Sequence, residues 1–167
     1  MRGGVGSTRP CCILEPMSIR FAHTNLVARD WRRLARFYWD VFACSPVGAE
    51  RALSGSWLDE AVAIPGAHIH GLHLRLPGHG ETGPTLEIFE YAPSRTSEPP
   101  TANRPGFGHV AFEVDDVAII VDCAIEHGGA RLGKTVTRAI EDAGTITFAY
   151  LRDPEGNIVE IQQWATA

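Results

Sequence analysis

RDPEGNIVEIQQ, residues 152–163, is the stretch that decides the fold. Its first half has strong turn chemistry, because Pro154 presets φ and Gly156 permits a positive φ. Asp153 and Asn157 can hydrogen-bond to the backbone of the same turn. Apolar runs flank the turn on both sides, so the stretch predicts a β-hairpin.

The second strand of this hairpin carries a carboxylate, Glu160, between Val159 and Ile161. Successive strand side chains point to opposite faces of a sheet, so Glu160 lies on the face opposite its two apolar neighbours. If Val159 and Ile161 pack under helices, Glu160 faces the concave side of the sheet. A carboxylate in that position indicates a function.

The bulk composition excludes several classes of protein. The 167 residues carry a net charge of −5 with a pI near 5.8 and contain no basic run, so we expect no nucleic-acid partner. No apolar stretch reaches the roughly 18–20 residues that span a bilayer, so we expect no membrane partner. The cysteines form no C-x-x-C pair, and we expect free thiols in a cytoplasmic protein. They are Cys11, Cys12, Cys44 and Cys123.

The chain divides into two similar halves. Residues 1–18 are predicted to be a flexible tail, 19–92 a first module, 93–105 a Pro-rich linker, and 106–167 a second module. Each module is predicted to contain a strand, a helix and then three strands. In the first module, the second strand is expected near residues 56–64 or as an irregular approach to one. Met17 is an alternative translation start, because the regular pattern of apolar residues begins immediately after it.

The halves also match residue by residue, which indicates an internal duplication. FAH at residues 21–23 corresponds to FGH at residues 107–109, an offset of 86. The same offset relates Asp30 to Asp116, the two expected helix N-caps. Near the module ends, LEI at 86–88 corresponds to VEI at 159–161.

Each module therefore contributes one histidine early and one glutamate late. If the modules pair side by side, these four side chains converge, and two imidazoles with two carboxylates suit a borderline divalent ion. A lone His or Glu in a strand is more often solvent-facing, but the repetition of the same types at equivalent points favours one metal ion, Ni²⁺, Co²⁺, Mn²⁺, Zn²⁺ or Fe²⁺. The predicted ligands are His23, Glu87, His109 and Glu160.

GFGHVAFEVDD at 106–116, DPEGNIVEI at 153–161 and the paired βαβββ pattern resemble the vicinal oxygen chelate superfamily. It includes glyoxalase I, methylmalonyl-CoA epimerase, extradiol dioxygenases, and fosfomycin and bleomycin resistance proteins. The resemblance implies an α+β fold of two tandem βαβββ modules, one domain over 19–164. The modules would form a cupped, mostly antiparallel sheet with helices on the outside, and the protein would be a homodimer.

The four-ligand pattern resembles glyoxalase I and implies a metal-dependent isomerase or lyase of the glyoxalase or epimerase type. Its small substrate would be an oxygen-chelating α-hydroxycarbonyl or acyl thioester that reacts through an enediolate. The resemblance makes Glu160 both ligand and general base, with Glu87 as its symmetric partner. Two alternatives stay open: an Fe(II) extradiol-type dioxygenase using His23, His109 and Glu160, and a small-molecule binding or antibiotic resistance protein.

The walls of the substrate pocket show no motif. Tyr150, across the terminal hairpin from Glu160, is the first candidate for a substrate contact, followed by Trp57 and His70. His68 and His70 share one strand face and His73 lies on the other. Asp59 and Glu60 are alternative bases if their segment curls over the cavity.

Overall fold

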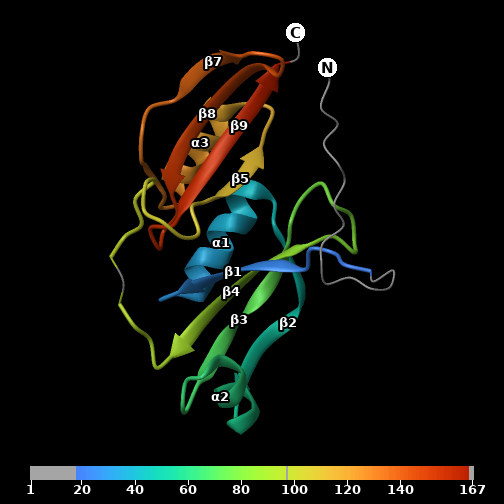
Figure 1. Ribbon diagram of the computed structural model, residues 1–167, viewed down its shortest axis with the longest axis vertical. Coiled ribbons are helices and arrows are strands. Elements are labelled where there is room, and N and C mark those ends of the chain that lie inside the picture. Colours follow the sequence, from blue (N-terminus) through green and yellow to red (C-terminus); the bar gives the residue numbers. More distant parts are fainter. Residues whose placement is uncertain (1–17, 97, 166–167) are drawn as a thin grey trace, which may run out of the picture.

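Two β-sheets carry the fold of the protein, which a computed structural model describes for residues 18–96 and 98–165 (Figure 1). Of the predicted tail, only residue 18 is described. Met17, Cys11 and Cys12 lie outside the described residues. The first sheet has the order β1 (His23–Ala28), β4 (Thr85–Ala92), β3 (His68–Arg75) and β2 (Ser45–Ser54). The second has the order β5 (Val110–Glu113), β9 (Ile158–Ala165), β8 (Gly144–Arg152) and β6 (Ala130–Arg131), and β7 (Val136–Ile140) also pairs with β8.

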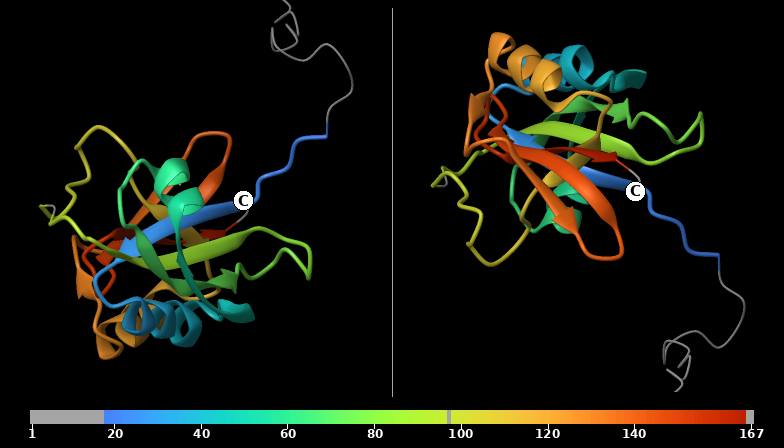
Figure 2. Two further views of the ribbon diagram at one scale, coloured as in Figure 1. Left: turned by 90° about the horizontal axis from the view of Figure 1, so that it is seen from below. Right: turned by 90° about the horizontal axis from the view of Figure 1, so that it is seen from above.

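The two sheets have the same plan. The first strand of each half pairs in parallel with the last strand, β1 with β4 and β5 with β9, and the other pairings are antiparallel. This confirms the expected α+β class with a mostly antiparallel arrangement. The expected single cupped sheet is two sheets, because no described strand of one half pairs with a strand of the other. The helices α1 (Trp31–Phe42) and α3 (Val117–Glu126) lie beside each other on one side of the sheets (Figure 2).

The predicted N-caps begin both of these helices. The carboxylate of Asp30 accepts the Arg33 N–H at 3.0 Å, and that of Asp116 accepts the N–H groups of Ala118 at 2.8 Å and Ile119 at 3.0 Å. One face of α1 repeats at helical spacing and packs onto the first sheet. Its buried residues are Trp31, Leu34, Ala35, Phe37, Tyr38, Val41 and Phe42.

A third helix departs from the prediction. The segment expected as a strand near 56–64 forms α2 (Ser56–Val62), and the second strand of the first module is β2, eleven residues earlier at Ser45. Asp59 stabilises the turn after α2, because its carboxylate accepts the N–H groups of Gly66 and Ala67 at 2.8 Å each. Leu58 packs with Ile69 and Phe89 in a small separate core.

This small core lies on the face of the first sheet that α1 does not cover. Leu74 of β3 and Ile88 of β4 pack with α1, and the alternation of strand side chains sends Ile69 and Phe89 to the opposite face. α2 therefore sits on the opposite face of the first sheet from α1, whereas all helices were expected on the outside. No helix among the described residues is long and apolar enough to cross a membrane.

The two halves are joined by a buried polar contact. The Tyr38 hydroxyl, on α1, donates to Asp153 Oδ2 at 3.0 Å, and Asp153 is only 3% exposed. The other lone pairs of this carboxylate accept the N–H of Glu155 and the N–H and side-chain amide of Asn157, each at 2.9 Å. Burial raises the pKa of Tyr38 well above its usual value, so the hydroxyl stays protonated and remains a donor.

Tyr38→Phe tests this joint. It removes one donor from a buried carboxylate, so we expect the free energy of unfolding to fall by about 1–3 kcal/mol. Chemical denaturation followed by circular dichroism measures the change. Tyr91→Phe, at a half-buried tyrosine outside this network, is the control. An equal, small effect of both substitutions would contradict the assignment.

Candidate functional site

Glu87 and Glu160 occupy the same register in the two halves. Each lies on the last strand of its half, between a parallel neighbour on the first strand and an antiparallel neighbour on the preceding strand. The neighbours are Asn25 and His73 for Glu87, and Ala111 and Tyr150 for Glu160. The predicted duplication is thus visible in the pairing of the strands, and it places His73 and Tyr150 at equivalent positions.

The first half-site consists of His23, Asn25, His73 and Glu87. Glu87 Oε2 accepts from Asn25 Nδ2 at 3.0 Å and lies 3.6 Å from His23 Nε2. Its other oxygen, Oε1, lies 2.9 Å from His73 Nε2. The two imidazole rings meet edge to face at 5.8 Å. The glutamate side chain is 15% exposed, so these donors replace most of the water around it.

His73, like Asn25, was not among the site residues predicted from the sequence. Its Nδ1 lies 3.0 Å from Thr85 Oγ1, and its Nε2 is a buried nitrogen without a hydrogen-bond partner among the described residues. The N–H direction is therefore not in line with Glu87 Oε1, although the atoms are close. Burial lowers the pKa of His73 and outweighs the opposing effect of the Glu87 charge, so the ring is neutral at pH 7.

The second half-site consists of His109, Tyr150 and Glu160. His109 Nε2 lies 2.9 Å from Glu160 Oε2, and the His109 and Tyr150 rings are 5.3 Å apart. Burial, and then the negative charge of Glu160, raise the pKa of Tyr150, so its hydroxyl is protonated at pH 7. The His109 side chain is 37% exposed, so this half-site is open to solvent.

The four predicted ligands come together in pairs, His23 with Glu87 and His109 with Glu160. Imidazole nitrogens and carboxylate oxygens have the right chemistry for a borderline divalent ion. Among residues 18–96 and 98–165, however, no group of three or more His, Cys, Asp or Glu side chains is arranged to hold a metal ion. The predicted donor set is therefore divided between the two half-sites, and neither half-site of the described chain forms a metal site by itself.

The other predicted pocket residues lie elsewhere. Trp57 is on α2 and 56% exposed, and His70 is an exposed residue on the strand face opposite His73. Asp59 is committed to the turn after α2 and is not a free base, and Glu60 follows it on the same helix. Of the three pocket candidates, only Tyr150 lies in a half-site. His73 has the same position beside Glu87 that Tyr150 has beside Glu160, and this equivalence could have identified His73 as a site residue.

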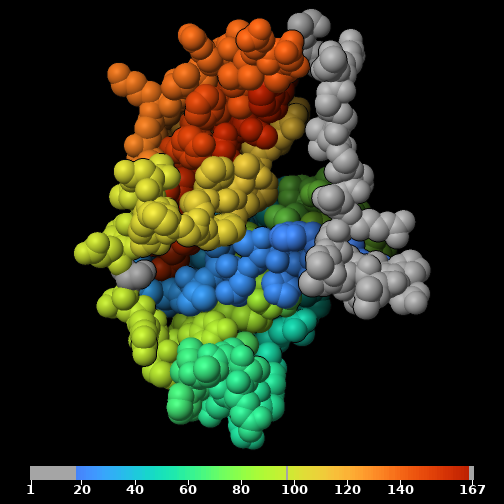
Figure 3. Space-filling model, viewed as in Figure 1, coloured from blue at the N-terminus to red at the C-terminus, as the bar shows by residue number. Residues whose placement is uncertain are grey.

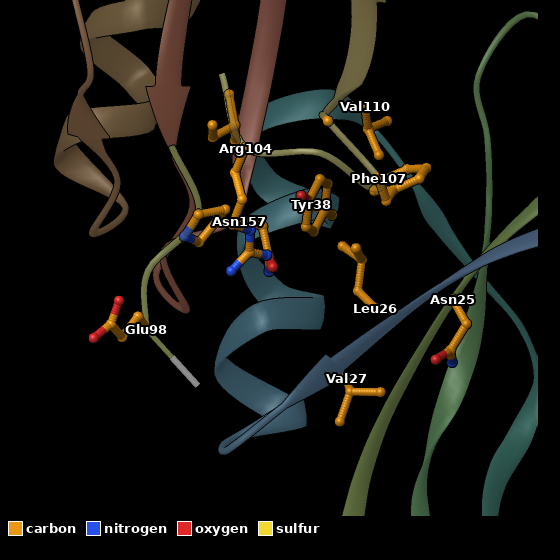
Figure 4. A pocket seen from close by; sticks show the side chains of 12 residues that line it. Asn25, Leu26, Val27, Tyr38, Glu98, Arg104, Phe107, Val110 and Asn157 are labelled. Carbon is orange, nitrogen blue, oxygen red and sulfur yellow. The ribbon is translucent and has the colours of Figure 1, made fainter. Parts of the chain in front are cut away.

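A cavity of about 280 Å³ lies where the two halves meet (Figure 4). Leu26 of β1 points toward Tyr38, with Phe107 and Val110 nearby (Figure 4). Asn25 and Val27 also border the cavity, but Figure 4 shows their side chains on the opposite side of β1 from Leu26. The cavity is therefore close to the first half-site without being part of it.

The comparisons with known proteins agree with this architecture. A glyoxalase family protein from Bacillus cereus superposes with a TM-score of 0.79 at 16% identity, covering 92% of this chain and 99% of that one. A glyoxylase/bleomycin resistance protein/dioxygenase domain from Frankia sp. EAN1pec gives 0.55 at 20% identity, covering 90% and 95%. A glyoxalase I variant from Zea mays gives 0.58 at 21%, covering 88% and 45%. At these identities the likeness concerns the fold alone.

No curated protein sequence matches the chain. A family model does, over residues 20–161, which include both half-sites and nearly all the strands described above. The repeated strand pairing, the two half-sites and this match lead to one conclusion. The chain belongs to the Glyoxalase/Bleomycin resistance protein/Dioxygenase superfamily.

Proposed function

We propose that the protein is a metal-dependent isomerase or lyase of the glyoxalase or epimerase type. Its substrate would be a small molecule with two adjacent oxygens, an α-hydroxycarbonyl compound or an acyl thioester. The observation that carries this proposal is the recurrence of one His–Glu pair at the same register of both halves. A duplicated pair of half-buried carboxylates, each beside an imidazole, is a costly arrangement unless a cation uses it.

His23, Glu87, His109 and Glu160 would hold the cation. When bound, a divalent ion supplies positive charge that stabilises an oxyanion on the substrate. Glu160 is the proposed general base, which takes a proton from the carbon next to the carbonyl. Its side chain is 13% exposed and lies 2.9 Å from His109 Nε2, so the carboxylate is held beside the proposed metal position with little water around it. Tyr150, protonated beside Glu160, can donate to a substrate oxygen.

We further propose that a second copy of the chain completes the site. Within one chain the half-sites lie in different sheets and do not converge. β1 and β5, which carry or adjoin the two histidines, are edge strands, and β1 crosses an open face of the molecule (Figure 3). Apolar side chains stand exposed beside both histidines, with Phe21 and Phe107 each 66% exposed. Exposed strand edges with apolar residues favour pairing with another chain.

The metal content of tag-free protein tests the first part. We expect about one divalent ion per chain by plasma mass spectrometry, and its loss in the double variant His109→Ala/Glu160→Ala. His70→Ala, at an exposed histidine outside both half-sites, should keep the metal. Protein that takes up no metal even after reconstitution would exclude the mechanism. Retained iron with oxygen uptake on a catechol would instead indicate a dioxygenase.

A complementation experiment tests the second part. The variants His23→Ala/Glu87→Ala and His109→Ala/Glu160→Ala each lack one half-site in every chain. If sites are shared between copies, a heterodimer of the two variants has one intact site, since each chain supplies the half that the other lacks. We therefore expect metal to return, up to one ion per heterodimer, when the two are co-expressed and purified with different tags.

If each chain closes its own site, the same heterodimer has none and binds no metal. Each variant alone is the control, and analytical ultracentrifugation of the wild-type protein should show a dimer.

Location in the cytoplasm stays a prediction from composition.

A further inference from the structure

The two half-sites share one frame but hold their carboxylates unequally. Glu87 has a donor on each neighbouring strand, Asn25 on β1 and His73 on β3. At the equivalent positions Glu160 has Ala111, which has no side-chain donor, and Tyr150. The difference concerns residues that are not among the predicted metal ligands, so it is not dictated by binding the metal.

We propose that His73 is a positioning residue: it holds Glu87 in one orientation as a fixed ligand and leaves Glu160 as the carboxylate that turns and takes a proton. This inference rests on the proposed function for its chemical purpose, although its geometric part does not need a metal. It replaces the symmetric roles of Glu87 and Glu160 with two different ones.

The contacts around Glu87 support a fixed orientation. Asn25 Nδ2 holds Oε2 at 3.0 Å, and His73 Nε2 lies 2.9 Å from Oε1, so both oxygens have a nitrogen within reach. His73 is itself fixed, because it is 13% exposed and its second nitrogen meets Thr85 Oγ1 at 3.0 Å. The Thr85 hydroxyl can donate to Nδ1, and in that tautomer the ring carries a hydrogen on Nε2, the nitrogen nearest Glu87.

The missing alignment between His73 and Glu87 is informative. His73 Nε2 is buried and lacks a hydrogen-bond partner among the described residues, and such a nitrogen is costly to leave unpaired. The terminal torsion of a glutamate is broad, so a small rotation of the carboxylate brings Oε1 into line at little cost. Glu87 and His73 can therefore form this hydrogen bond as the carboxylate takes up its ligand orientation.

The histidine ligands do not hold the carboxylates in the same way. His23 and His109 face Glu87 and Glu160 through Nε2, at 3.6 and 2.9 Å, and Nε2 is the atom each would give to a cation. If Nε2 binds a cation, Glu87 still has Asn25 and His73 beside it, whereas among the described residues Glu160 has the Tyr150 hydroxyl alone. Removing such an outer hydrogen-bond partner of a ligand typically lowers metal affinity about 10–100-fold.

The test compares His73→Leu, which removes the donor, with His73→Gln, whose amide can place an N–H near the position of Nε2. His70→Leu, at the exposed histidine on the opposite face of the same strand, is the matched control. The first readout needs no metal: three-bond couplings of the Glu87 methylenes in full-length, isotope-labelled protein. We expect one rotamer in the wild type, His73→Gln and His70→Leu, and rotamer averaging in His73→Leu.

The second readout is Co²⁺ titration with visible spectra. We expect affinity to fall about tenfold in His73→Leu with a changed d–d band, to recover in His73→Gln, and to stay unchanged in His70→Leu. Unchanged Glu87 couplings in folded His73→Leu, or averaged couplings in the wild type, would overturn the inference. If the wild type binds no Co²⁺ while the couplings behave as expected, the proposed function fails and His73 still positions Glu87. If His73→Leu does not fold, Glu87 averaging in folded His73→Gln would count against the inference.

Discussion

The buried carboxylate of Asp153 is the contact on which the arrangement of the two halves depends. It closes its own turn through Glu155 and Asn157 and receives the Tyr38 hydroxyl from the helix of the other half. A carboxylate that is almost fully buried costs several kcal/mol unless its lone pairs are satisfied, and here four donors satisfy them. The same turn fixes the register of β8 and β9. One residue thus orders the strands that carry Tyr150 and Glu160 and ties them to α1.

A second set of contacts strengthens this joint from the same turn. Glu155 pairs with Arg29 at 2.8 Å and accepts the N–H of Asp30, at the start of α1, at 3.1 Å. Phe42, at the other end of α1, stacks on Phe112 of β5 at 4.2 Å. Both ends of α1 therefore contact the second half, so the helix covers its own sheet and also spans to the neighbouring one. This packing keeps the two half-sites of one chain in separate sheets.

The parts of the fold that the sequence could predict are those with local chemistry. The DPEGN turn, the caps Asp30 and Asp116, and the apolar stripe of α1 each depend on neighbours within a few residues, and the structure has all of them. α2 could not be predicted in this way. It is a single short helix, and its stability comes from packing Leu58 against Ile69 and Phe89. These two residues lie on β3 and β4, which follow α2 in the sequence.

The same distinction explains the candidate site. His23, Glu87, His109 and Glu160 were identifiable because the duplication repeats them in sequence. His73 could not be identified in this way. Its contact with Glu87 depends on how β3 and β4 align, which is set by the length of the loop between them. The pairing of His73 with Glu87 fixes that register, and a shift of one residue would have turned His73 to the other face. Repeated residues mark what the two halves have in common, while the strand register shows where they differ. A base must take up a proton, whereas a ligand must stay in place. The separate roles proposed for the two glutamates therefore follow from the unequal donors around them, Asn25 and His73 beside Glu87 but Ala111 and Tyr150 beside Glu160.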